Sequence, residues 1–271
     1  KLRVCIADEA LNLNQMDRMI DFPYNIEFFG QECEYNGSSL THGTLCMLLL
    51  LKALHNQGVL NQVKVSHFSV SAKNERLSYN QLLNALDYCF QKEIDILSLS
   101  IGLTNRHELD GMVKRIRKLD HTLIIAAAAN SFSLTYPAAL AEVLGVRRSL
   151  RKNSPIFERR YQPPDGTEII ANYSRSILQE IAPNFGNTFE NSNSVIVPQI
   201  VAVVAKKAIE YKQFPTKAFA LSVLTADLVS TDTEKYELPN PDRLSENDMI
   251  PIILLPGQVD IIMVPINQTT P

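Results

Sequence analysis

The chain has 271 residues, of which 45% are hydrophobic and 20% charged, and its net charge is −3. This composition is that of a globular protein and excludes disorder, collagen-like repeats and coiled coil over the whole chain. The longest unbroken apolar run, Leu45–Leu51, is too short to span a membrane as a helix. The mild acidity argues against nucleic acid as a partner.

Segments with strand and helix patterns alternate over the first two-thirds of the chain. In chain order, the apolar spacing predicts a strand over 2–7, a helix over 43–55, a strand over 63–70, a helix over 79–92, a strand over 94–99, a helix over 109–119, a strand over 123–128 and a helix over 198–211. The first of these helices is apolar all round, which indicates that it is buried. The alternation predicts an α/β fold with a mainly parallel central sheet between helices.

Two segments interrupt this alternation. Arg147–Arg160 is strongly basic and is followed by a Pro-Pro-Asp-Gly sequence, which predicts an exposed loop. Asp227–Asp248 is acidic and contains two prolines, as is typical of a linker. We therefore expect one domain over residues 1–230 and a C-terminal extension over 231–271, in which two apolar segments favour a small β-hairpin, Ile250–Leu255 and Val259–Ile266.

The four cysteines form no CxxC pair, so the sequence predicts neither a zinc ribbon nor a thioredoxin-like motif. Cys5, Cys46 and Cys89 lie within apolar patterns and are predicted to be small buried hydrophobes. No signal-peptide pattern is visible, and the sequence leaves both the cellular compartment and the oligomeric state open.

Four polar residues stand where predicted strands end or predicted helices begin. Asp8 follows the first strand, His42 precedes the first helix, Asn130 follows the strand over 123–128, and Ser194 comes just before the last helix. Taken singly, each is a cap or turn residue. Taken together, Asp, His and Ser are the components of a nucleophilic triad, and Asn can donate a hydrogen bond to an oxyanion.

Six segments extend this constellation, in order along the chain: Val4–Asp8, Thr41–Thr44, Ile94–Gly102, Ile124–Asn130, Tyr136–Ala138 and Ser192–Pro198. In motif and spacing they resemble the segments of the subtilisin-like serine peptidases, or subtilases. The resemblance runs from about residue 2 to residue 230, and it implies a three-layer subtilisin-like fold.

The resemblance also implies the roles of individual residues. Ser194 would be the nucleophile, His42 its base, Asp8 the residue that orients His42, and Asn130 an oxyanion donor. The substrate would lie along the segment Ser98, Leu99, Ser100, Ile101 and Gly102, with Thr135 beside the S1 specificity pocket. A peptide or protein substrate is implied. No cofactor and no metal are expected, because the segment after His42 leaves little room for the calcium-binding loop of many secreted members.

Several family glycines are replaced by residues with side chains. The family's Asp-Thr/Ser-Gly is Asp8–Glu9–Ala10, the Gly-Thr before the nucleophile is Ser192–Asn193, and Ala129 stands before Asn130. Side chains at these positions would narrow the cleft. We therefore expect a specific processing or maturation endopeptidase that works through an acyl-enzyme.

Two other functions stay open. One is a catalytically inactive subtilase-fold protein that binds peptides, which the replaced glycines favour and the complete triad opposes. The other is a generic nucleotide-binding α/β domain, against which the absence of GxGxxG and GxxxxGK[ST] counts.

Overall fold

The structure is a computed structural model. It describes residues 1–30, 34–37, 40–71, 78–103, 109–130, 134–149, 157–159, 166–172, 177, 181 and 192–226. Cys33, the acidic segment and the predicted C-terminal hairpin lie outside the described residues, as does most of the basic segment. Among the residues that are described, no helix combines the length and apolar character needed to cross a membrane.

The described strands form one sheet, in the order β2-β3-β1-β4-β5-β6-β8-β7. All neighbouring strands run parallel except β7 and β8, which are antiparallel. The strands are β1 (Leu2–Glu9), β2 (Ile26–Gly30), β3 (Val63–Ser71), β4 (Ile96–Leu99), β5 (Leu123–Ala127), β6 (Leu144–Arg148), β7 (Phe157–Arg159) and β8 (Ile169–Ala171). The predicted α/β fold with a mainly parallel sheet is confirmed.

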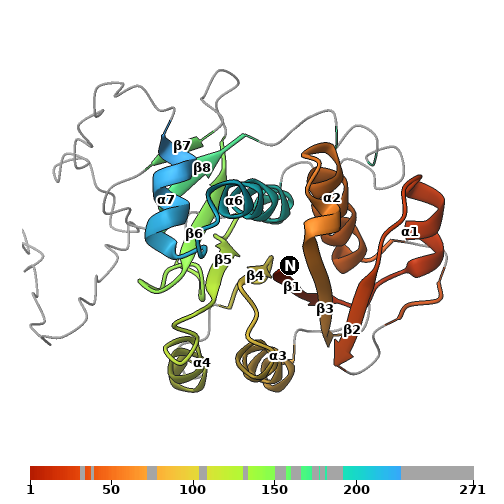
Figure 1. Ribbon diagram of the computed structural model, residues 1–271. Helices are drawn as coiled ribbons and strands as arrows, with labels where there is room; N and C mark the ends of the chain where they lie inside the picture. The colour runs from red at the N-terminus through yellow and green to blue at the C-terminus, as the bar shows by residue number, and fades with distance from the viewer. Residues whose placement is uncertain are drawn as a thin grey trace, which may run out of the picture. The chain divides into compact units, whose positions relative to one another are not determined.

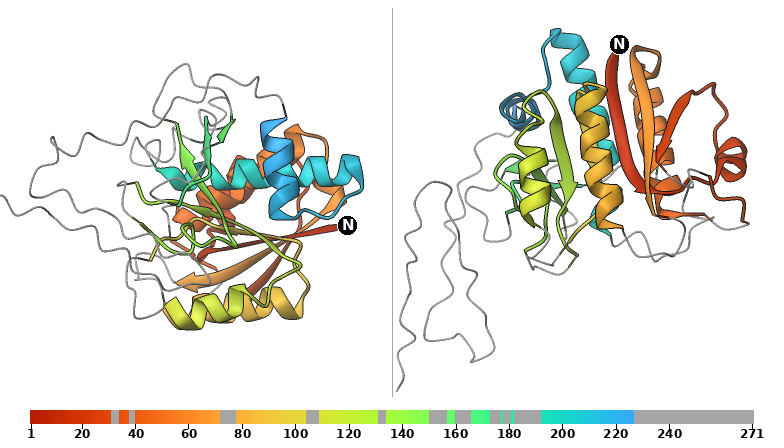
Figure 2. Two further views of the ribbon diagram at one scale, coloured as in Figure 1. Left: turned by 90° about the vertical axis from the view of Figure 1, so that its left-hand side faces the viewer. Right: turned by 90° about the horizontal axis from the view of Figure 1, so that it is seen from below.

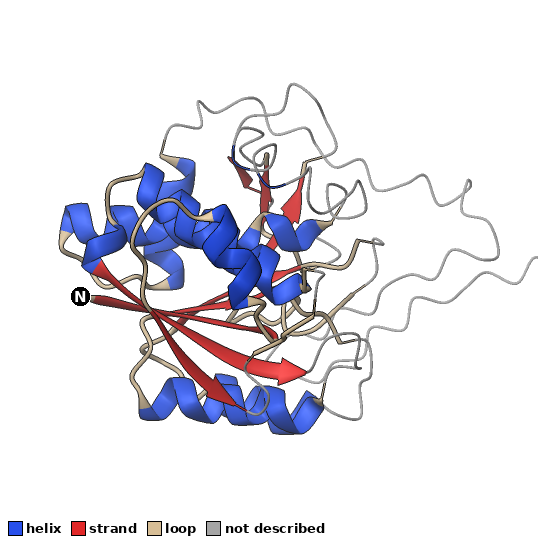
Figure 3. Cartoon of the chain, turned by 90° about the vertical axis from the view of Figure 1, so that its right-hand side faces the viewer, coloured by secondary structure: helices blue, strands red, loops and turns tan. Residues whose placement is uncertain are grey.

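Helices cover both faces of this sheet (Figures 1 and 3). One face carries the neighbours α2 (His42–Asn56) and α6 (Val197–Tyr211), with α1 (Leu13–Met19) and α7 (Lys217–Thr225) packed into the same apolar core. The other face carries α3 (Tyr79–Gln91) and α4 (Leu109–Ile116), side by side in Figure 2. The sheet is therefore the middle of three layers.

Alternate residues of β1 serve the two cores. Val4 and Ile6 contribute to the core under α2 and α6, whereas Cys5 and Ala7 contribute to the core under α3 and α4. Because both faces are covered, the strand is apolar at every position from Val4 to Ala7. The predicted burial of Cys5, Cys46 and Cys89 is confirmed, and all three are free thiols.

The expectation of an exposed loop from Arg147 onward is wrong at both ends of that segment. Arg147 and Arg148 belong to β6, and residues 157–159 form β7. Arg147 is only 4% exposed, and its Nη2 donates to the Ala129 carbonyl at 3.2 Å. The apolar residues of β6 come before its two arginines, so the basic segment as a whole gave no indication of a buried strand. The Arg147 side chain lies beside the end of β5.

The first turn of α2 lies directly against the end of β1. Thr41 caps the helix by accepting a hydrogen bond from the Thr44 amide at 3.0 Å, and its hydroxyl donates to the Ala10 carbonyl at 2.6 Å. A Cβ atom on Gly43 would lie 2.0 Å from the Glu9 carbonyl oxygen. Only glycine therefore permits this approach, which sets the position of His42 relative to β1.

We expect Gly43→Ala to lower the free energy of unfolding by about 2–3 kcal/mol, since the added methyl meets backbone that cannot rotate away. Urea denaturation measures this. Gly102→Ala is the matched control, because its Cβ would lie 3.4 Å from Thr135, an ordinary contact. Equal stability of the two variants would contradict the steric argument.

Candidate active site

Asp8 lies at the carboxyl end of the central strand β1 and is 2% exposed. Its Oδ1 accepts hydrogen bonds from the Glu9 amide and from His42 Nδ1, both at 2.8 Å. The pairing of β1 with β3 shifts at this point, from Asp8 opposite Ser69 to Glu9 opposite Ser71. Such irregularities redirect side chains at strand ends, and here Asp8 and Glu9 both come to lie beside the start of α2.

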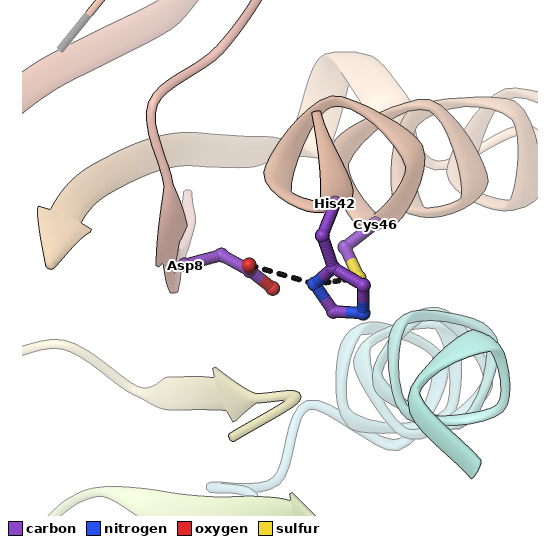
Figure 4. A group of neighbouring side chains, drawn as sticks. All are labelled: Asp8, His42 and Cys46. Atoms are coloured by element: carbon purple, nitrogen blue, oxygen red, sulfur yellow. Dashed lines mark hydrogen bonds and ion pairs between the residues drawn. The ribbon is translucent and has the colours of Figure 1, made fainter. Parts of the chain in front are cut away.

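His42 opens α2 with its ring directed at Asp8 (Figure 4). Because a carboxylate can only accept, Nδ1 carries the proton of the 2.8 Å bond, and the lone pair of the neutral ring is on Nε2. The His42 backbone amide donates to Glu9 Oε2 at 2.9 Å, which ties the same residue to β1 a second time. The arrangement makes Nε2 the basic atom of the pair.

Burial and the ion pair act in opposite directions on these two groups. Burial lowers the pKa of His42, but the Asp8 carboxylate raises that pKa well above its usual value. Burial raises the pKa of Asp8, but the charge and hydrogen bond of His42 bring that pKa below its usual value. Burial is the largest single influence on each pKa, but the charges and hydrogen bonds around the pair together outweigh it. The pair therefore favours an imidazolium beside a carboxylate.

Cys46 lies one turn along α2, with Sγ 3.9 Å from Nδ1 and 4.0 Å from Nε2 of His42. Burial raises the pKa of this thiol, so it stays neutral and packs against the ring. One ligand atom from each of Asp8, His42 and Cys46 lies within 4.8 Å of the others. A thiophilic cation held there would compete with Asp8 for His42.

Ser194 lies in the short helical turn Asn193–Val195 that precedes α6, and it is 6% exposed. Its hydroxyl is hydrogen-bonded to the Ser192 hydroxyl. Its carbonyl accepts a hydrogen bond from Ser100 Oγ at 3.1 Å. That contact joins the Ser194 turn to the segment that follows β4.

Asn193 fastens the same turn to the sheet. Its amide nitrogen Nδ2 donates to the Ala129 carbonyl at 2.8 Å, and its Oδ1 accepts from the Arg148 amide at 3.0 Å. Its backbone amide donates to Asn130 Oδ1 at 2.8 Å. Because this bond fixes the oxygen end of the Asn130 side chain, Nδ2 is the end that can donate to a ligand.

A pocket of about 250 Å³ opens between these elements. It is lined by residues from the ends of β1 and β3, the start of α2 and the segment after β4, namely Asp8, Glu9, His42, Val70, Ser71, Ser100 and Ile101. The structure thus brings Asp8 and His42 into direct contact, and joins Ser194 to Asn130 through Asn193 and to the pocket through Ser100.

The residues predicted to bind substrate fall into two groups. Ser98 and Leu99 are fully buried, within a strand that pairs with both β1 and β5, so their backbone is already occupied. Ser100, Ile101 and Gly102 lie beyond that pairing and are at least partly exposed. Thr135 is 5% exposed, and its hydroxyl accepts from the Ala129 amide at 3.0 Å, so it supports the end of β5.

Sequence reasoning did not assign a role to Glu9, Asn193 or His67. Glu9 and Asn193 were noted only as replacements of family residues, although each stands next to a triad candidate. His67 lies within β3 opposite Ile6 and is fully buried. Burial lowers its pKa to about 4, so it is neutral at pH 7 and adds no cation beside Asp8. The strand pattern around His67 did not predict that this histidine would be fully buried and neutral.

Comparisons with known proteins bear on the family and the fold of this chain. The model of the subtilase family matches residues 1–214. Among curated proteins none matches. A lanthipeptide protease superposes with a TM-score of 0.57 at 13% identity, over 86% of this chain and 81% of that one.

Two further solved structures share the fold. A cold-adapted subtilisin-like serine proteinase matches with a TM-score of 0.53 at 14% identity, over 82% of this chain and 79% of that one. The nisin leader peptidase of Lactococcus lactis matches with a TM-score of 0.50 at 13% identity, over 82% and 80%. Since the family model covers most of the chain, the chain belongs to the subtilase family.

Proposed function

We propose that this subtilase is a serine endopeptidase that cleaves peptide bonds with Asp8, His42, Ser194 and Asn130. The observation that carries the proposal is the 2.8 Å hydrogen bond from His42 Nδ1 to Asp8 at the end of the central strand. A serine hydroxyl is a weak nucleophile until a base removes its proton. The Asp8–His42 pair is such a base, because it leaves Nε2 unprotonated in the neutral ring.

In the proposed reaction, Ser194 Oγ forms a bond to the substrate carbonyl carbon while His42 Nε2 takes the hydroxyl proton. The resulting oxyanion is held by the Asn130 side-chain amide and the Ser194 backbone N–H. His42 then gives its proton to the leaving amine, the C–N bond breaks, and an ester to Ser194 remains. Water, activated in turn by His42, hydrolyses that ester, while Asp8 stabilises the imidazolium at each step.

The substrate is proposed to pair as an added strand with Ser100–Gly102, which lie beyond the paired part of β4. Glu9, Ser192 and Asn193 place side chains where relatives have small or shorter residues, which restricts what enters. This restriction, together with the similarity to a lanthipeptide protease and to a leader peptidase, supports a specific maturation role, such as removal of a leader from a peptide precursor.

One observation favours a second function, that of an inactive peptide-binding protein. The Ser192 hydroxyl contacts the Ser194 hydroxyl and also accepts from the Ser194 backbone amide at 3.3 Å. It therefore engages both the proposed nucleophile and one proposed oxyanion donor. A substrate carbonyl has to displace Ser192 for the reaction to begin.

Labelling with a small fluorophosphonate separates these two functions. We expect the native protein to gain one phosphonyl group on Ser194, as measured by intact mass and peptide mapping, because His42 activates that hydroxyl. Ser194→Ala abolishes the label, and His42→Ala slows labelling by at least about 10³-fold.

Ser192→Ala is the matched serine control in this experiment. Labelling that stays on Ser194 in this variant confirms which of the two adjacent hydroxyls reacts. A folded native protein that takes up no label would contradict the peptidase and favour the peptide-binding function.

The pKa of His42 is a second test, measured by NMR titration of its ring. We expect a value above the usual 6.5 or so, and a fall of about one unit or more in Asp8→Asn, because the neutral amide removes the attraction that favours imidazolium. Asp87→Asn, which removes a carboxylate paired with Arg115 on the surface, is the control and leaves the His42 value unchanged. An identical His42 titration in native protein and Asp8→Asn would refute the coupling.

A further inference from the structure

We propose that Glu9 makes this site select peptides that carry a lysine or arginine close to the cleaved bond. The inference rests on the proposed peptidase function and adds the class of substrate to it. It is built on the pocket of about 250 Å³ beside His42, and on Glu9, a carboxylate of that pocket whose bond goes to the His42 backbone amide rather than to the ring.

The pocket is placed to receive a substrate side chain. His42, the proposed base, is part of its lining. Ser100, whose hydroxyl donates to the Ser194 carbonyl, lines it as well. A side chain inside it therefore belongs to a residue only a short distance along the peptide from the reacting carbonyl. Whole-ligand pockets measure about 300–1,000 Å³, so a site of this size takes a single side chain.

Among the described residues, two carboxylates line the pocket, and they differ in what they can still bind. Asp8 is 2% exposed, and its Oδ1 already accepts two hydrogen bonds. Glu9 is partly exposed, and its Oε2 accepts from the His42 backbone amide at 2.9 Å. A carboxylate has two oxygens and about four lone pairs, so the bond to His42 leaves Glu9 able to accept further donors from the pocket.

The rest of the lining suits a long cationic side chain. Val70 and Ile101 offer apolar surface for methylene groups, and Ser71 and Ser100 offer polar groups near the rim. Among the described lining residues there is no lysine or arginine to neutralise Glu9. Asp8 is paired with the His42 ring, so the charge that acts on an incoming side chain is that of Glu9. A cation is thus attracted to Glu9, whereas an acidic side chain would be repelled by it.

The competing interpretation is that Glu9 only caps the start of α2. That role accounts for the bond from the His42 amide, and a glutamine can fulfil it because its side-chain oxygen also accepts. Glu9→Gln therefore keeps the cap and removes the charge, which separates the two roles within one variant.

The experiment measures kcat/KM for a peptide series in which each position near the cleaved bond is in turn lysine, norleucine or glutamate. At one position we expect the native protein to prefer lysine over norleucine by about tenfold, as a charge-assisted hydrogen bond provides, and to disfavour glutamate. In Glu9→Gln the lysine preference falls to about one. Glu27→Gln is the matched control, since Glu27 pairs with Lys64 on the first strands of the sheet, and it keeps the preference.

A binding measurement makes the result independent of the chemistry. The affinities of the same peptides for Ser194→Ala, with and without Glu9→Gln, report the pocket even if the native protein proves inactive. Lysine selectivity that depends on Glu9 in this measurement supports the proposal. The proposal is overturned if lysine selectivity survives Glu9→Gln, or if no position prefers lysine. Fluorophosphonate labelling of the native protein reports separately on the proposed peptidase activity.

Discussion

The close approach of helix α2 to the end of strand β1 is the constraint on which the whole site depends. Gly43 permits it, since any Cβ there would lie 2.0 Å from the Glu9 carbonyl oxygen. Two hydrogen bonds then join α2 to the end of β1. The Thr41 hydroxyl donates to the Ala10 carbonyl, and the His42 amide donates to the Glu9 carboxylate. These contacts hold the start of α2 beside the end of β1, which places the His42 ring 2.8 Å from Asp8.

A second junction holds the nucleophile candidate in place. Asn193 bonds to the ends of β5 and β6, so the turn that carries Ser194 is tied to the sheet on both sides. The family usually has a smaller residue here, and the larger amide of Asn193 makes three links that a shorter side chain could not make. These bonds hold the turn that carries Ser194 against the ends of β5 and β6.

The core of the fold was predictable because its signal is local. Strand β1, helix α2 and strand β5 contain unbroken apolar runs, which are Val4–Ala7, Leu45–Leu51 and Leu123–Ala127. A sheet covered on both faces requires that pattern. The sequence also singled out four candidate site residues, Asp8, His42, Asn130 and Ser194. Each stands where an apolar segment ends or begins, and their ordered spacing resembles that of a known family. Their roles remain proposals.

What the sequence did not reveal depends on contacts between distant segments. Strand β6 was not predicted because two arginines at its end are typical of an exposed segment. In the structure Arg147 is buried and donates a hydrogen bond to the Ala129 carbonyl. Helix α1 and strand β2 are short and gave too few repeats for a pattern. The position of Glu9 depends on a shift in pairing between β1 and β3, and only the three-dimensional register shows it.

In the proposed mechanism His42, oriented by Asp8, activates Ser194. The most direct measurement follows the rate at which a fluorophosphonate modifies Ser194 as a function of pH, alongside the NMR titration of His42 in the same sample. Only neutral His42 can accept the hydroxyl proton, so we expect the rate to rise with pH, with a midpoint that coincides with the pKa of His42. A rate that does not change as His42 loses its proton would show that His42 is not the base that activates Ser194.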